Sequence, residues 1–141
     1  MALFFGTSKH QIDAKNRIRI PPKFSDKLGT AFYVARGTDR CLYCFSEDTF
    51  AKYTQEFDNT PAYLPDNAMS LKRHFFNSVE EVEKDGQGRV LLPPALVAYA
   101  NLTKDIVIAG TGDRLEIWDA DAYEEVVGGK DFNQVLKDMN G

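Results

Sequence analysis

The chain has 141 residues, of which 43% are hydrophobic and 27% are charged, and its formal net charge is −4. This length suits one compact domain, and this composition excludes both a disordered chain and one built from membrane-spanning segments. The net charge conceals a polarity, because residues 1–40 hold eight Lys or Arg against three Asp or Glu, and the rest of the chain holds nine against eighteen. The basic first part suits an anionic partner, although charges also fall unevenly over short windows by chance.

The same arrangement of residues occurs twice along the chain. An Asp-x-x-x-Arg motif followed by Pro-Pro stands as "DAKNRIRIPP" from Asp13 and again as "DGQGRVLLPP" from Asp85. Further along, "DRCLYC" from Asp39 returns as "DRLEIW" from Asp113. This self-similarity indicates an internal duplication. Two such copies can form a pseudo-twofold domain in which each half covers the apolar face that the other leaves open.

Each copy predicts the same elements in the same order: two short strands, a helix that Pro-Pro begins, two more strands and a longer helix. Proline cannot donate to a strand ladder but suits a first helical turn, so Pro-Pro ends the second strand. Ser46 and Asp119 are suited to cap the longer helices. The predicted strands are 7–12, 17–20, 31–36 and 41–45, then 79–83, 89–92, 105–110 and 115–118, and the longer helices are 46–57 and 119–127.

We expect a single domain over residues 1–141. It divides into an N-terminal repeat at 4–57, a connector at 58–75 with a helix at 69–76, a C-terminal repeat at 76–127 and a tail at 128–141. The tail is either mobile or a short docking helix, and the sequence leaves both open. Short strands joined by turns, with brief helices attached, predict an α+β fold built around a small β-barrel.

Cys41 and Cys44 in "CLYC" are the only cysteines, and the two histidines, His10 and His74, stand far from them. Zinc is usually held by four ligands, and residues three apart in a strand point to opposite faces. We therefore expect two buried strand cysteines instead of a metal or redox site. We also expect no cofactor and no enzymatic activity, because the sequence offers no catalytic constellation, metal-ligand set or glycine-rich phosphate loop.

The turn inside each motif predicts an arginine held in place. Asn16 precedes the Arg in the first copy and Gly88 in the second, and these two residue types accept a left-handed backbone most readily. The Asp can accept hydrogen bonds from backbone N–H groups of its own turn, or hold the Arg by an ion pair. Either would place a planar guanidinium, which matches phosphate and guanine edges, at the tip of a rigid loop. The alternative is an Asp-Arg pair that only rigidifies the turn.

The charges around the two motifs differ. The first has Lys9, Lys15, Arg17, Arg19 and Lys23 against Asp13 alone, and the second has Glu80, Glu81, Glu83 and Asp85 against Lys84 and Arg89. We therefore expect the first loop to bind an anionic polymer, and the second to be retained for architecture or for a weaker auxiliary contact. His10 either contacts phosphate as well or packs with Ile12.

The motifs together resemble those of the MraZ family of bacterial transcription regulators. The resemblance rests on "FFGTSKHQIDAKNRIRIPPKF", "VEKDGQGRVLLPPAL" and "GDRLEIWD", and it covers about residues 4–127. It implies a swapped-hairpin barrel of the AbrB type, formed within one chain by the two repeats. The family usually has Gly where Asn16 stands here, and Asn16 is expected to keep the turn because it tolerates the same backbone region. The DNA-binding residues that follow from the motifs and their basic neighbours are Asp13, Lys15, Asn16, Arg17, Arg19, Lys9, Asp85 and Arg89.

The resemblance further implies closed-ring homo-oligomers that bind double-stranded DNA at repeated promoter sites ahead of the division and cell-wall gene cluster. Such a regulator would act in the cytoplasm, on the nucleoid, and the N-terminal residues show no signal-peptide pattern. Neither a membrane nor a small-molecule substrate is expected as a partner. One alternative stays open: a ring-forming interaction protein, or an antitoxin-like barrel, with a protein partner. Its mark would be an exposed apolar groove or tail, with residues 128–141 as the candidate.

Overall fold

The computed structural model describes residues 3–58 and 65–140, so residues 59–64 of the predicted connector lie outside the described residues. The first part of the chain forms β1 (Thr7–Gln11), β2 (Arg17–Arg19), α1 (Pro22–Leu28), β3 (Ala31–Arg36), β4 (Leu42–Phe45) and α2 (Glu47–Asp58). The second part forms α3 (Asp66–Ser78), β5 (Glu80–Glu83), β6 (Arg89–Leu91), α4 (Pro94–Tyr99), β7 (Asp105–Gly110), β8 (Leu115–Asp119), α5 (Ala120–Tyr123) and α6 (Phe132–Asn140). Each predicted strand is present, with ends that differ by at most one residue at either side.

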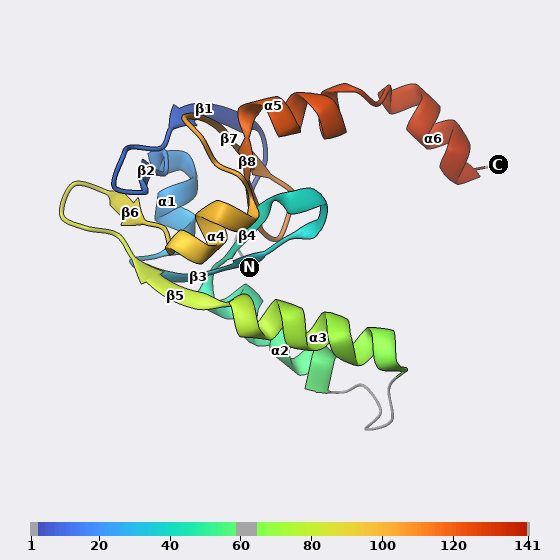
Figure 1. Ribbon diagram of the computed structural model, residues 1–141, viewed down its shortest axis with the longest axis horizontal. Coiled ribbons are helices and arrows are strands. Elements are labelled where there is room, and N and C mark those ends of the chain that lie inside the picture. Colours follow the sequence, from blue (N-terminus) through green and yellow to red (C-terminus); the bar gives the residue numbers. More distant parts are fainter. Residues whose placement is uncertain (1–2, 59–64, 141) are drawn as a thin grey trace.

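The strands form a six-stranded antiparallel sheet in the order β1-β7-β8-β4-β3-β5 and a two-stranded ribbon of β2 and β6 (Figure 1). The two repeats exchange strands. β1 of the first repeat pairs with β7 of the second, and β5 of the second pairs with β3 of the first. Each repeat therefore completes the sheet of the other, which confirms the two-repeat, mixed α+β architecture.

The large sheet is open, with β1 and β5 at its edges. The ribbon is linked to these edges by isolated contacts: a bridge joins Lys84 and Val90, and the backbone N–H of Asp13 donates to the carbonyl of Arg17, 3.0 Å away. In the described part of the chain no continuous ladder joins all strands into a closed barrel. The described residues therefore show an open antiparallel sheet with the ribbon packed across it.

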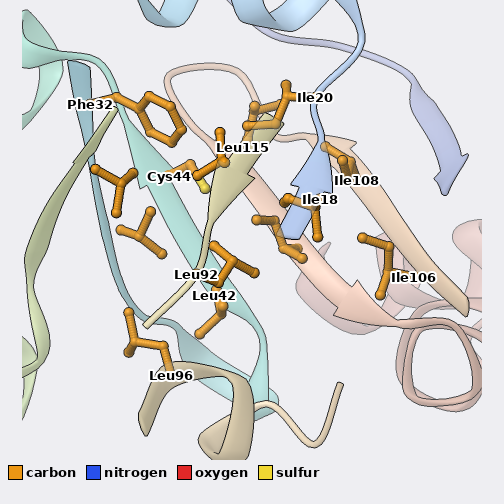
Figure 2. Close-up of a cluster of buried hydrophobic side chains, with 14 of the residues drawn as sticks. Ile18, Ile20, Phe32, Leu42, Cys44, Leu92, Leu96, Ile106, Ile108 and Leu115 are labelled. Carbon is orange, nitrogen blue, oxygen red and sulfur yellow. The ribbon is translucent and has the colours of Figure 1, made fainter. Parts of the chain in front are cut away.

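The core lies between the sheet and the ribbon. Ile18 and Val90, which face each other at the centre of the ribbon, are 1% and 0% exposed. In Figure 2 the side chains of Ile18 and Leu92 gather with Leu42, Ile108 and Leu115 of the large sheet in one buried cluster. Burial of a side chain of this size stabilises the fold by about 1.5–3 kcal/mol. The ribbon is therefore held in place by its buried face, which leaves its other face to solvent.

The two helix-cap predictions have different outcomes. The hydroxyl of Ser46 accepts a hydrogen bond from the backbone N–H of Thr49, 3.4 Å away, as expected of a cap. The prediction for Asp119 is wrong, because its carboxylate accepts instead from the backbone N–H and the hydroxyl of Thr103, at 3.2 and 2.9 Å. The expected helix at 119–127 is a short α5 continued by a single π-helical turn at Glu124–Gly128.

The cysteines lie on opposite faces of the sheet, as strand alternation predicts. Cys44 belongs to the main core, whereas Cys41 packs in a second cluster with Trp118 on the other face. Both side chains are fully buried, and burial raises the pKa of both thiols, that of Cys44 to about 12. Both thiols are therefore inert packing groups. Among the helices of the described residues, none is long and apolar enough to cross a membrane.

Candidate nucleic-acid interface

The first Asp-x-x-x-Arg turn is built around the carboxylate of Asp13. Its Oδ1 accepts hydrogen bonds from the backbone N–H groups of Lys15 and Arg17, each 2.9 Å away, and its Oδ2 accepts from Nε of Arg17 at 2.7 Å. The backbone N–H of Asn16 donates to the carbonyl of Asp13 at 3.0 Å, and Asn16 has a left-handed φ of 62°. One side chain thus shapes the turn and holds the guanidinium, so both predicted roles of the Asp are filled at once.

The second turn repeats this geometry bond for bond. Oδ1 of Asp85 accepts from the backbone N–H groups of Gln87 and Arg89 at 2.8 and 2.9 Å, and Oδ2 accepts from Nε of Arg89 at 3.0 Å. Gly88, with a φ of 77°, donates to the carbonyl of Asp85 at 3.0 Å. Asn16 and Gly88 therefore fill the same left-handed position, as the sequence predicts.

The carboxylates stay ionised well below neutral pH. Hydrogen bonding by the backbone N–H of Arg17 is the largest cause that lowers the pKa of Asp13, and the Arg17 side chain and the N–H of Lys15 lower it further. The pKa of Asp85 is lowered in the same way, chiefly by the backbone N–H of Arg89. Exposed ion pairs contribute only about 0–1 kcal/mol to stability. The main effect of each pair is therefore positional, since it holds the Arg side chain in one orientation.

The ribbon brings the two arginines of the motifs onto one surface. In its register Arg17 lies opposite Leu91, Ile18 opposite Val90, and Arg19 opposite Arg89. Ile18 and Val90 face the core, so strand alternation puts the other four side chains on the solvent face of the ribbon. We call this the ribbon face: Arg17, Arg19, Arg89 and Leu91. It carries three guanidinium groups and one apolar side chain.

Two of these like charges lie directly opposite each other. Arg19 and Arg89 are cross-strand partners, a position in which Cβ atoms are about 4.5–5.5 Å apart and like charges destabilise the sheet. Among the side-chain nitrogens of the three arginines, only Nε of Arg17 and Nε of Arg89 form hydrogen bonds with the described residues, which leaves the terminal amino groups open to a ligand. A polyanion would relieve this repulsion and accept those hydrogen bonds.

Lys9 does not join the ribbon face. It pairs across the ladder with Val107, and the two line a shallow groove with Asp105, Asp121 and Glu124 on the face of the sheet that α5 covers. Lys15, by contrast, is exposed at the tip of the first turn. The structure therefore gathers seven of the eight predicted residues in and around the ribbon and places Lys9 elsewhere.

His10 lies on the same strand face as Ile12 and is half-buried. Its Nε2 is 2.6 Å from the hydroxyl of Ser8. Burial lowers the pKa of His10, and the positive charge of Lys23 lowers it further. Of the two interpretations that the sequence left open, packing beside Ile12 therefore fits better than a phosphate contact.

The acidic strand β5 lies beside the first turn as well as before the second. Glu80, Glu81 and Glu83 line one pocket with Lys15 and Asn16. The backbone carbonyl of Asn16 also accepts from the N–H of Leu92, 2.9 Å away. Strand exchange causes this neighbourhood, because it carries the first turn over to the second repeat. The charges near each motif along the sequence are thus a poor guide to the charges near it in space.

Comparison with known proteins places these features in a family. A family model described as "MraZ protein, putative antitoxin-like" matches residues 3–72 and again residues 75–136. Together the two matches span most of the chain, one for each repeat. The chain belongs to the MraZ family. The recognition made from the two motifs is thereby confirmed.

Individual members of the MraZ family match over nearly the full chain. A protein of Lactiplantibacillus plantarum named transcriptional regulator MraZ is 40% identical over 87% of this chain and 86% of its own length. A protein of Clostridium tetani with the same name is 37% identical over 98% of this chain and 97% of its own length. These relatives carry the name of a regulator and not of an enzyme, in agreement with the expectation of no enzymatic activity.

Leu91 is the ribbon-face residue that sequence reasoning missed. Its side chain is 61% exposed although it stands on a short strand between buried residues. In this MraZ chain it takes the place in the second repeat that Arg19 takes in the first. Strand alternation could have found it, since Val90 and Leu92 are apolar neighbours that both face the core. The ribbon face is therefore nearly twofold, with one arginine replaced by an apolar group.

Proposed function

We propose that this MraZ chain is a sequence-specific DNA-binding regulator of transcription, and that its ribbon face contacts double-stranded DNA. One observation carries the proposal: two turns with the same hydrogen bonds hold Arg17 and Arg89 on one exposed two-stranded ribbon, with Arg19 between them. The names of the relatives support the same function.

A two-stranded ribbon is narrow enough to enter the major groove of B-DNA, where a guanidinium can bond to O6 and N7 of guanine. Because Nε of Arg17 is already bonded to Asp13, its terminal amino groups are held ready for such a contact. A side chain that is already ordered loses less conformational entropy on binding. Leu91, beside Arg17, is placed to contact a thymine methyl group. Arg19 and Lys15 then complete the contacts to the phosphate backbone.

Several finer features belong to the same proposal. The chain divides into repeats at 4–57 and 76–127, and their exchanged hairpins make a barrel-like body of the AbrB type. Copies assemble into a closed ring, in the cytoplasm and on the nucleoid, and bind repeated sites ahead of the division and cell-wall gene cluster. Once one subunit is bound, the others bind intramolecularly, so the affinity of the whole assembly for DNA can exceed that of one subunit by roughly 10²–10⁴-fold.

The test is a DNA-binding titration at two salt concentrations with the promoter that precedes the gene for this chain. Arg17→Ala should weaken binding by about 1–3 kcal/mol, or roughly 5- to 150-fold, as for loss of one bidentate base contact. Arg89→Ala should weaken it less, because the first turn carries the cation Lys15 where the second carries the neutral Gln87. Lys52→Ala removes the same charge from the exposed surface of α2 and serves as the control. A folded Arg17→Ala variant that binds as tightly as Lys52→Ala would remove the basis of the proposal.

A second function, binding to a protein partner, is favoured by one observation. Phe132 and Met139 on α6 are 75% and 80% exposed, although both are large and apolar. Such side chains usually mark an interaction surface. An oligomer that forms normally but does not bind its promoter DNA would favour this second function over the first.

A further inference from the structure

Helix α6 has an apolar face that none of the described residues covers. Phe132, Val135, Leu136 and Met139 are spaced so that all four lie on one side of the helix, and they are 38–80% exposed. The helix is nevertheless well formed, because the carboxylate of Asp131 accepts a hydrogen bond from the backbone N–H of Gln134 at 3.0 Å, as an N-cap does. The predicted tail is thus a capped amphipathic helix.

The same chain has an apolar groove elsewhere, which none of the described residues fills. It has a volume of about 460 Å³ and lies among α2, α3, the end of β3 and the end of α4. Its apolar lining includes Tyr43, Tyr53, Leu71, Phe75 and Tyr99, and Leu71 is 66% exposed. We call it the aromatic groove.

The aromatic groove is preformed. The hydroxyl of Tyr99 donates to the carbonyl of Gly37 at 2.6 Å, and the hydroxyls of Thr38 and Tyr43 are 2.9 Å apart. Tyr99 also lies under the guanidinium of Arg36, 5.3 Å from its ring centroid. Such a wall needs little rearrangement to accept a partner, which lowers the entropic cost of binding.

The charges of the helix and the groove are complementary. Nη1 of Arg36 donates to Nδ1 of His74 at 3.2 Å, so a guanidinium stands at the groove, and among the described residues no carboxylate lines it. Asp131, which caps α6, and Asp138 within α6 are seven residues apart and therefore flank the same side of the apolar face. An α6 seated with its apolar face in the groove can place these carboxylates near the guanidinium.

The two features lie on separate parts of the molecule. In Figure 1, α6 extends beyond α5 at one side, whereas α2 and α3 project together below the sheet. A contact between α6 of one copy and the groove of another is therefore head to tail. Contacts of this kind generate closed rings when the rotation between copies closes, and open filaments when it does not.

We propose that α6 of one chain docks into the aromatic groove of a second copy, and that this contact joins the subunits of the assembly. The inference deepens the proposed ring and rests on that part of the proposed function. In this assembly the apolar face of α6 and the aromatic groove bury each other, and neither surface is part of the ribbon face.

The test uses full-length protein and compares molar masses by sedimentation. Phe132→Asp alters the helix and Leu71→Asp alters the groove, and both side chains are exposed, so the fold should persist and circular dichroism checks it. Each variant should fall from the mass of an assembly to that of one chain, 15.9 kDa. Asn133→Asp, which puts the same charge on an exposed position of α6 outside its apolar face, should leave the assembly intact.

Mixing the two defective variants gives the decisive result. The intact helix of Leu71→Asp and the intact groove of Phe132→Asp can still make one contact, so the mixture should form dimers of twice the chain mass. A parent protein that is monomeric, variants that still assemble, or a mixture that stays monomeric would each overturn the proposal.

Failure of this interface can be told from failure of DNA binding. Arg17→Ala should keep the mass of the parent while it loses DNA affinity. Phe132→Asp should keep salt-sensitive binding to a single site but lose roughly 100-fold or more on repeated sites. If Phe132→Asp assembles normally while Arg17→Ala loses DNA, only the interface is refuted.

Discussion

The left-handed position in the second turn offers a direct test of how these motifs are built. Gly88 has a φ of 77°, and a Cβ added there would meet no atom within 4 Å. Replacement by Ala therefore causes no clash, and its cost comes from the backbone alone. For a residue with a Cβ, the left-handed conformation costs about 1–2 kcal/mol. We expect Gly88→Ala to reduce the free energy of unfolding by that amount.

The same turn supplies its own control. Gly86 also has open space around an added Cβ, and its φ lies outside the left-handed region. Gly86→Ala should be neutral or stabilise the protein by about 0.4–1 kcal/mol, because it restricts the unfolded chain. The two alanine variants should then differ by about 1–3 kcal/mol, or about 0.5–1.5 M in the urea midpoint if the slope is about 2 kcal/mol/M.

A third variant makes the second turn resemble the first. Gly88→Asn copies the residue that stands at Asn16, whose φ of 62° shows that this chain accepts Asn in the same turn. Its midpoint should lie between those of the parent and Gly88→Ala, since Asn tolerates this conformation better than Ala. The measurement is urea unfolding at one fixed protein concentration, because assembly makes stability depend on concentration. Equal midpoints for Gly88→Ala and Gly86→Ala would refute the argument.

Three further predictions concern the core, the turns and the thiols. Ile18→Ala removes a fully buried side chain at the centre of the ribbon and should cost about 2–5 kcal/mol in urea unfolding, so a loss below 1 kcal/mol would mean that the ribbon is loosely packed. Asp13 and Asp85 have lower pKa values in the folded protein than the value of 3.8 in the unfolded chain, so their ionised carboxylates stabilise the fold above pH 3.8. This stabilisation is lost as the pH falls through their pKa values in the folded protein. Asp13→Asn with Asp85→Asn should therefore flatten the acid side of the stability profile, and an unchanged profile would contradict the hydrogen-bond pattern. Cys41 and Cys44 should react with a thiol reagent at pH 8 only after urea unfolds the protein, whereas rapid labelling of the native protein would contradict their burial.

The sequence by itself determined the local structure of this protein. Pro-Pro ended the ribbon strands and began α1 and α4, and Ser46 capped α2, because proline geometry and capping act within a few residues. The two turns were predicted from Asn16 and Gly88 for the same reason. Recognition of two repeats, and with it the family, also followed from the sequence.

Only the tertiary structure decided which of these local pieces meet. Strand exchange put Arg19 opposite Arg89 and left Lys9 on the other side of the sheet. It also brought Glu81 of the second repeat beside Lys15 of the first. The fold also brought Thr103, 16 residues away along the chain, next to Asp119, whose carboxylate bonded to Thr103 instead of capping a helix. Pairing of distant strands depends on how remote side chains pack together, so neither the register of the ribbon nor the charges around it could be predicted from neighbours along the chain.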